Sequence, residues 1–96
     1  MIESAAMQLQ DAPHGLNIVV ETRTGRVVIG RFDSADPFSA LLHDCDVRDF
    51  APGEDREAFI RETATYGIDV KQRDVKVDVG SVANVRMLRD IAKLGT

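Results

Sequence analysis

The sequence predicts a mainly β fold, in which a short N-terminal helix precedes a strongly bent, five-stranded antiparallel small barrel. Three observations support this prediction. Five short segments carry the apolar alternation or the β-branched residues that are typical of strands. Turn signals with glycine or proline separate most of these segments. Gly30 falls inside the second segment, and a glycine in mid-strand marks the bulge or bend that a small barrel needs to close.

The size and composition indicate one globular domain over residues 1–96. The chain is 44% hydrophobic and 29% charged, as in ordinary globular proteins. With a net charge of −4, the chain has no general excess of basic residues of the kind that duplex-binding proteins use, so any contact with nucleic acid has to come from a local group of residues. Cys45 is the only cysteine, which excludes an intrachain disulfide and a cysteine zinc cluster.

The hydropathy pattern gives no sign of a membrane segment. No run of about 18 apolar residues occurs, and the N-terminal stretch has no apolar core of signal-peptide length. We therefore expect a cytoplasmic protein that makes no membrane contact.

The first half of the chain predicts a helix and three strands. Residues 3–10, within an N-terminal segment 1–13, combine helix formers with a rough apolar stripe, and Pro13 and Gly15 end the helix. Residues 16–50 hold strands at 16–23, 26–32 and 39–50, with turns at 24–25 and at the acidic stretch 33–37. The strand at 26–32 is apolar on both faces, so we expect another element to cover its outer face.

The second half is less regular. Residues 51–72 are a variable segment that fits either a short helix or the outer part of a hairpin, and both interpretations stay open. Residues 74–89 hold two strands, at 74–79 and 82–88, separated by Gly80-Ser81, and residues 90–96 form a tail. In an incompletely closed barrel, these last two strands each present an unpaired edge. If one edge of a subunit pairs with the other edge of the next, a homo-oligomeric ring can close.

Residues 16–50 resemble the first motif of the Sm/LSm family, which includes the bacterial Hfq branch. The similar features are a turn glycine, a bent hydrophobic strand, a loop aspartate and a leucine-rich strand, at Gly25 and Arg26, Gly30 and Phe32, Asp36, and Leu41, Leu42 and Asp44 to Asp46. The second motif is matched more loosely by residues 75–88, with Gly80 as its glycine.

The resemblance implies an Sm-like, SH3-type barrel that forms a ring of about five to seven subunits. It also implies single-stranded RNA as a partner, bound without catalysis or a cofactor at the ring pore or face. The residues that it assigns to RNA binding are Asp36, Phe38, Ser39 and Gly80. Two family positions differ, because Ser39 or Ala40 replaces an asparagine and Val79 stands where the family has an arginine.

Each of these candidates also has a purely structural interpretation. Phe38 either stacks on a base or plugs the barrel end or a subunit contact. Asp36 either contacts a ligand or accepts hydrogen bonds from backbone amides of its own loop. The alternative function is a homo-oligomeric structural or protein-interaction ring that has lost uridine recognition, which the two differing positions and the acidic charge favour.

Two further groups of residues carry side chains that could bind a ligand or react. His43 and Cys45 lie two apart, on one face of an extended strand, but they are too few for a zinc site and lack the third group that a nucleophile needs. We therefore expect neither a metal nor an enzyme activity. Six basic residues of the second half either form a locally positive surface when a ring repeats them on one face, or are solvated rim charges paired with Asp74, Asp78 and Asp90: Lys71, Arg73, Lys76, Arg86, Arg89 and Lys93.

Overall fold

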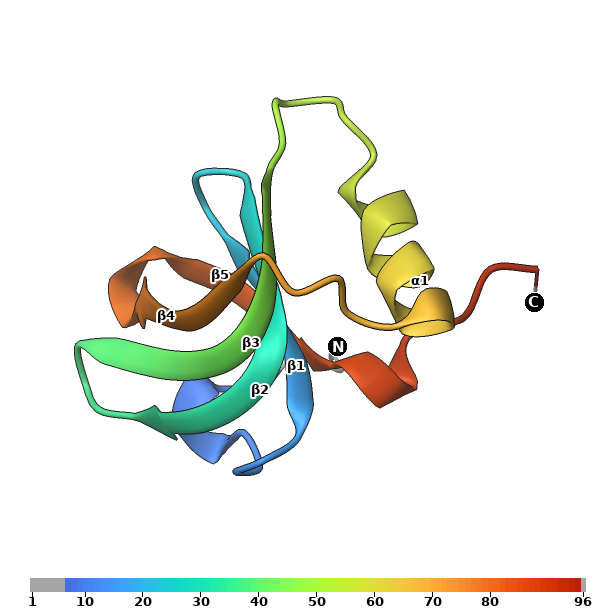
Figure 1. Ribbon diagram of the computed structural model, residues 1–96. Helices are drawn as coiled ribbons and strands as arrows, with labels where there is room; N and C mark the ends of the chain where they lie inside the picture. Colours follow the sequence, from blue (N-terminus) through green and yellow to red (C-terminus); the bar gives the residue numbers. More distant parts are fainter. Residues whose placement is uncertain (1–6, 96) are drawn as a thin grey trace.

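The computed structural model describes residues 7–95, which form a small, mainly β domain (Figure 1). Within these residues there are five strands, one α-helix and three short 3-10 helices. The strands are β1 (Asn17–Thr22), β2 (Arg26–Ala35), β3 (Ser39–Asp49), β4 (Gln72–Asp78) and β5 (Val82–Met87). The helices are η1 (Leu9–Asp11), α1 (Arg56–Tyr66), η2 (Val79–Ser81) and η3 (Leu88–Asp90).

The five strands form one antiparallel sheet in the order β4-β3-β2-β1-β5, which confirms the predicted strand content. Consecutive strands are neighbours except β5, which returns to pair with β1. The sheet is strongly curved (Figure 1). β4 and β5 lie at its two edges, as the sequence predicts for the last two strands.

The concave side of the sheet holds the larger hydrophobic cluster, here called the inner core. All five strands contribute to it, which they can do only because the sheet curls around it. Its largest side chains include Ile18, Val20, Val28, Phe32, Leu42, Val77, Val85 and Met87. Leu9 of η1 belongs to the same cluster.

The opposite face of the sheet is covered by α1, as the apolar outer face of the second strand predicts (Figure 1). Phe59 and Ile60 of α1 and Ile91 of the C-terminal segment pack on strand residues in a second cluster, here called the outer core: Val19, Val27 and Ile29. Asp55 is the N-cap residue of this helix, and its carboxylate accepts a hydrogen bond from Ala58 N at 3.1 Å. Of the two interpretations of residues 51–72, the helix is correct.

Gly30 lies opposite a β-bulge, as predicted for a bent strand. Ile29 pairs with Asp46 and Arg31 pairs with His43, so Gly30 alone faces both Asp44 and Cys45. A Cβ atom on Gly30 would overlap Cys45 Sγ and would lie 2.9 Å from His43 O. Only glycine allows the two strands to approach this closely.

Several boundaries differ from those predicted. The second strand continues to Ala35, because a register shift after Phe32 lets Ser34 and Ala35 pair with β3, so the turn shortens to residues 36–38. Val79 belongs to η2 and not to the fourth strand.

Half of the N-terminal helix expected over residues 3–10, residues 3–6, lies outside the described residues. In its described part, residues 7 and 8 are not helical, and residues 9 and 10 belong to the 3-10 helix η1. Among residues 7–95, no helix has the length and apolar character needed to cross a membrane.

Candidate functional site

The structure brings the four residues of the predicted RNA site into one region. Asp36 and Phe38 lie in the β2–β3 loop, Ser39 begins β3, and Gly80 lies in η2. The backbone N–H of Val79 donates to Phe38 O at 2.9 Å, which joins the loop to η2, and Ser39 pairs with Asp78. The two segments that carry the candidates are therefore neighbours.

Asp36 fixes the shape of the loop. Its Oδ1 accepts hydrogen bonds from the backbone N–H groups of Phe38 at 2.7 Å and Ser39 at 2.8 Å. Its own N–H donates to Ser39 O at 2.9 Å. The bonds from Ser39 and Phe38 stabilise the charged carboxylate and lower the pKa of Asp36 below its ordinary value. This is the loop-forming role that the sequence leaves open for Asp36.

Phe38 is presented to solvent by this rigid loop. Its side chain is 79% exposed and belongs to neither the inner nor the outer core. Within residues 7–95, it therefore plugs no end of the sheet. An aromatic ring on a loop fixed by four hydrogen bonds is available for stacking or for a contact with another subunit.

Arg23 supplies a cation beside η2 that sequence reasoning missed. Its Nη1 donates to Gly80 O at 2.5 Å, and its backbone N–H donates to Ser81 O at 2.8 Å. Gly80 N donates to Asp78 Oδ1 at 3.1 Å, which holds the turn from its other side. No local pattern reveals the contact, because Arg23 and Gly80 are 57 positions apart in the chain.

His43 and Cys45 do not share a site. The bulge at Asp44, where φ is 52°, breaks the alternation that a regular strand has, so the expected common face is wrong. Cys45 is buried in the inner core, and burial raises the pKa of its thiol to about 11. His43 instead contacts two carboxylates. Among residues 7–95, no group of three or more His, Cys, Asp or Glu side chains is arranged to hold a metal ion.

His43 links three strands. Its Nδ1 lies 2.7 Å from Asp74 Oδ1 on β4, and its Nε2 lies 3.0 Å from Asp33 Oδ2 on β2. Only the protonated imidazolium donates from both ring nitrogens at once. The hydrogen bonds to Asp74 and Asp33 raise the pKa of His43 above its ordinary value.

This arrangement predicts that stability depends on pH. Because the folded-state pKa of His43 is raised, its stabilising contribution is complete below about pH 6.5 and is lost as pH rises through the folded-state pKa. Urea unfolding across about pH 5 to 9 should show that the wild type is more stable than His43→Gln at low pH, and that this difference in the free energy of unfolding narrows toward high pH. His14→Gln, which removes an exposed imidazole, is the matched control and should keep the pH dependence of the wild type. A constant difference between the wild type and His43→Gln would contradict this role.

Two of the six basic residues noted in the sequence are paired with acids. Arg86 donates to Glu57 at 2.9 and 3.0 Å and to Glu21 at 2.9 Å. Lys71 Nζ lies 3.2 Å from carboxylate oxygens of both Asp46 and Asp69. Both residues are therefore paired with acids, as the rim-charge interpretation expects, but their partners are not the predicted Asp74, Asp78 and Asp90.

No protein-family model matches the chain, and no curated protein is significantly similar to it.

Proposed function

We propose that the chain is an Sm-like protein that binds single-stranded RNA without catalysis, as a homo-oligomeric ring. The observation that supports this best is the hydrogen bond from Val79 N to Phe38 O. It joins the loop of the first motif to the turn of the second, which are the two segments that the family resemblance assigns to RNA. Phe38 is exposed at this junction.

In this proposal, a base stacks on the ring of Phe38 and the hydroxyl of Ser39 bonds to its edge. Aromatic stacking with a few polar groups is the common way in which proteins hold single-stranded RNA. Asp36 acts through the loop that it fixes, with its carboxylate oriented by two backbone amides. Arg23, beside Gly80, provides the positive charge that the valine at position 79 does not.

The proposed ring uses the two edge strands. In an antiparallel pair, the N–H groups of successive residues point alternately toward and away from the neighbouring strand. Because Val79 N donates to Phe38 O, the N–H groups at odd positions of β4 face β3, and those at even positions, including Lys76, face the open edge. On the other edge, Val85 O accepts a hydrogen bond from Met7 N at 3.1 Å. In the ring, β4 of a neighbouring subunit replaces Met7 at this edge. The ring repeats the RNA site in every subunit, so weak contacts with one RNA strand add up through effective concentration.

The strand order and the bend at Gly30 support an Sm-like, SH3-type barrel. Because β4 and β5 lie at opposite edges, each subunit has two unlike edges. A contact between β4 of one subunit and β5 of the next is heterologous, and it closes into a ring of about five to seven subunits when the rotation between subunits allows.

The second candidate function is a structural or protein-interaction ring without uridine recognition. It is favoured by Val79 in place of the family arginine and by the net charge of −4, which repels a polyanion. In that case Phe38 lies in a contact between proteins.

Titration of short U-rich, A-rich and mixed single-stranded RNAs at two salt concentrations tests the proposal. Phe38→Ala should weaken binding by about 1–3 kcal/mol per stacked base, or about 5- to 150-fold, while the oligomer mass is unchanged. Tyr66→Ala is the matched control, because Tyr66 is also 79% exposed but lies on α1, and it should bind like the wild type.

Two results would count against RNA binding at Phe38. Absence of wild-type binding at low salt would favour the interaction ring. Equal losses in the Phe38 and Tyr66 variants would indicate non-specific contact.

A further inference from the structure

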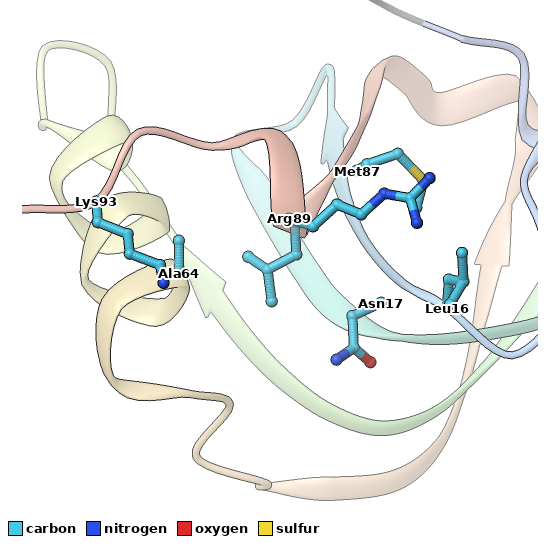
Figure 2. Close-up of a pocket in the computed structure, with 7 residues that line it drawn as sticks. Leu16, Asn17, Ala64, Met87, Arg89 and Lys93 are labelled. Atoms are coloured by element: carbon cyan, nitrogen blue, oxygen red, sulfur yellow. The ribbon is translucent and has the colours of Figure 1, made fainter.

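A pocket of about 340 Å³ opens between the C-terminal segment, α1 and the start of β1 (Figure 2). Its apolar lining comes from Leu16, Ala64, Met87 and Leu88. The pocket shares no residue with the β2–β3 loop or with η2. It is therefore a second candidate site, independent of the proposed RNA function.

The walls of this pocket are fixed by hydrogen bonds. Arg61 of α1 donates from Nε to Ala92 O at 3.0 Å and from Nη2 to Lys93 O at 2.8 Å. Leu94 N donates to Thr65 Oγ1 at 2.8 Å. Ile91 is buried in the outer core. These contacts hold the C-terminal segment against α1, so the pocket is preformed, as small-molecule sites usually are.

The polar lining of the pocket favours an anion. It consists of Asn17, Arg89 and Lys93, with no carboxylate, although the chain has 16 acidic and 12 basic residues. Arg89 has no hydrogen-bond or ion-pair partner among residues 7–95. Figure 2 shows Lys93 near Ala64 at one end of the pocket, while Arg89 extends away toward the other end. Positive charge therefore flanks the apolar lining.

We propose that this pocket binds a small organic anion with an apolar or aromatic body. The body packs on Leu88 and Ala64, and a carboxylate or phosphate group bonds to the guanidinium of Arg89, which presents a rigid fork of N–H donors to such groups. The apolar lining disfavours a bare inorganic anion, and the lack of carboxylates disfavours a cation. The same chemistry occurs in a free carboxylic acid and in a nucleoside monophosphate.

Backbone ¹⁵N chemical shifts of the full chain, measured during titration, test this proposal. The anionic probes are 1-naphthoate and adenosine 5′-monophosphate, and the uncharged counterparts are 1-naphthalenemethanol and adenosine. At least one anion should shift the signals of Asn17, Ala64 and Leu88 to saturation. Its affinity should be about tenfold higher than that of its uncharged counterpart. The anion that binds identifies the source class.

Substitutions separate binding in the pocket from general charge attraction. Arg89→Ala should weaken the bound anion about tenfold. Arg73→Ala removes the same charge from an exposed position on β4 and should have no effect. Ala64→Leu, which fills the pocket, should abolish these shifts, while the remaining signals should still be those of the folded protein.

Three results would overturn the proposal. These are the absence of shifts with both anions, equal binding of charged and uncharged probes, and wild-type affinity in Arg89→Ala. Shifts centred on Phe38 and not on the pocket would also contradict it.

Discussion

Replacing Phe59 with alanine should lower the free energy of unfolding by about 3–5 kcal/mol. The Phe59 side chain is only 4% exposed and fills the outer core between α1 and the sheet. Its ring centre lies 5.7 Å from that of Phe50, and the guanidinium of Arg48 lies 4.3 Å above it. A loss of this size is a large share of the roughly 5–15 kcal/mol that stabilises a typical domain.

Chemical denaturation followed by circular dichroism measures this loss. Tyr66→Ala is the matched control on the same helix, because it truncates an aromatic residue that is 79% exposed, and its effect should stay within about 0.5 kcal/mol. If the two variants lost similar stability, α1 would not be packed on the sheet as described.

If the chain forms the proposed ring, proline at position 76 should abolish its assembly and leave the subunit folded. The N–H of Lys76 faces the open edge of β4 in the alternation set by the bond from Val79 N to Phe38 O. Proline removes that donor and is tolerated on edge strands. Light scattering after size exclusion should therefore give the mass of a monomer, with the circular dichroism spectrum of the wild type.

Two variants control this experiment. Lys76→Ala loses the same charge but retains the N–H and should assemble normally. Val77→Pro removes a donor that faces β3, so it should destabilise β4 itself. A full-sized oligomer of Lys76→Pro would contradict pairing through this edge.

The strands could be predicted because their signals are local. The alternation of Val75 and Val77, the turn at Gly25 and the glycine within the second strand each act over a few residues. The sequence does not decide between a helix and a hairpin for the α1 segment, because the helix buries only Phe59, Ile60 and Thr63, which form a narrow apolar stripe. Its stability comes from packing on the sheet, which no local pattern reveals.

The candidate site was predicted in part. The loop that carries Asp36, Phe38 and Ser39 lies beside the turn that carries Gly80, whereas Arg23 reaches η2 through a contact between distant positions that no local pattern shows. The expected common face of His43 and Cys45 fails for a related reason. The bulge at Asp44 depends on the pairing with β2, so the sequence of β3 alone does not show it.

Native mass spectrometry of the protein mixed with a short U-rich RNA tests the central proposal most directly, because one spectrum reports both assembly and stoichiometry. A ring with RNA at its pore predicts a closed oligomer of about five to seven chains that carries one RNA strand. A monomer that binds RNA, or one strand on every chain of an oligomer, would contradict it.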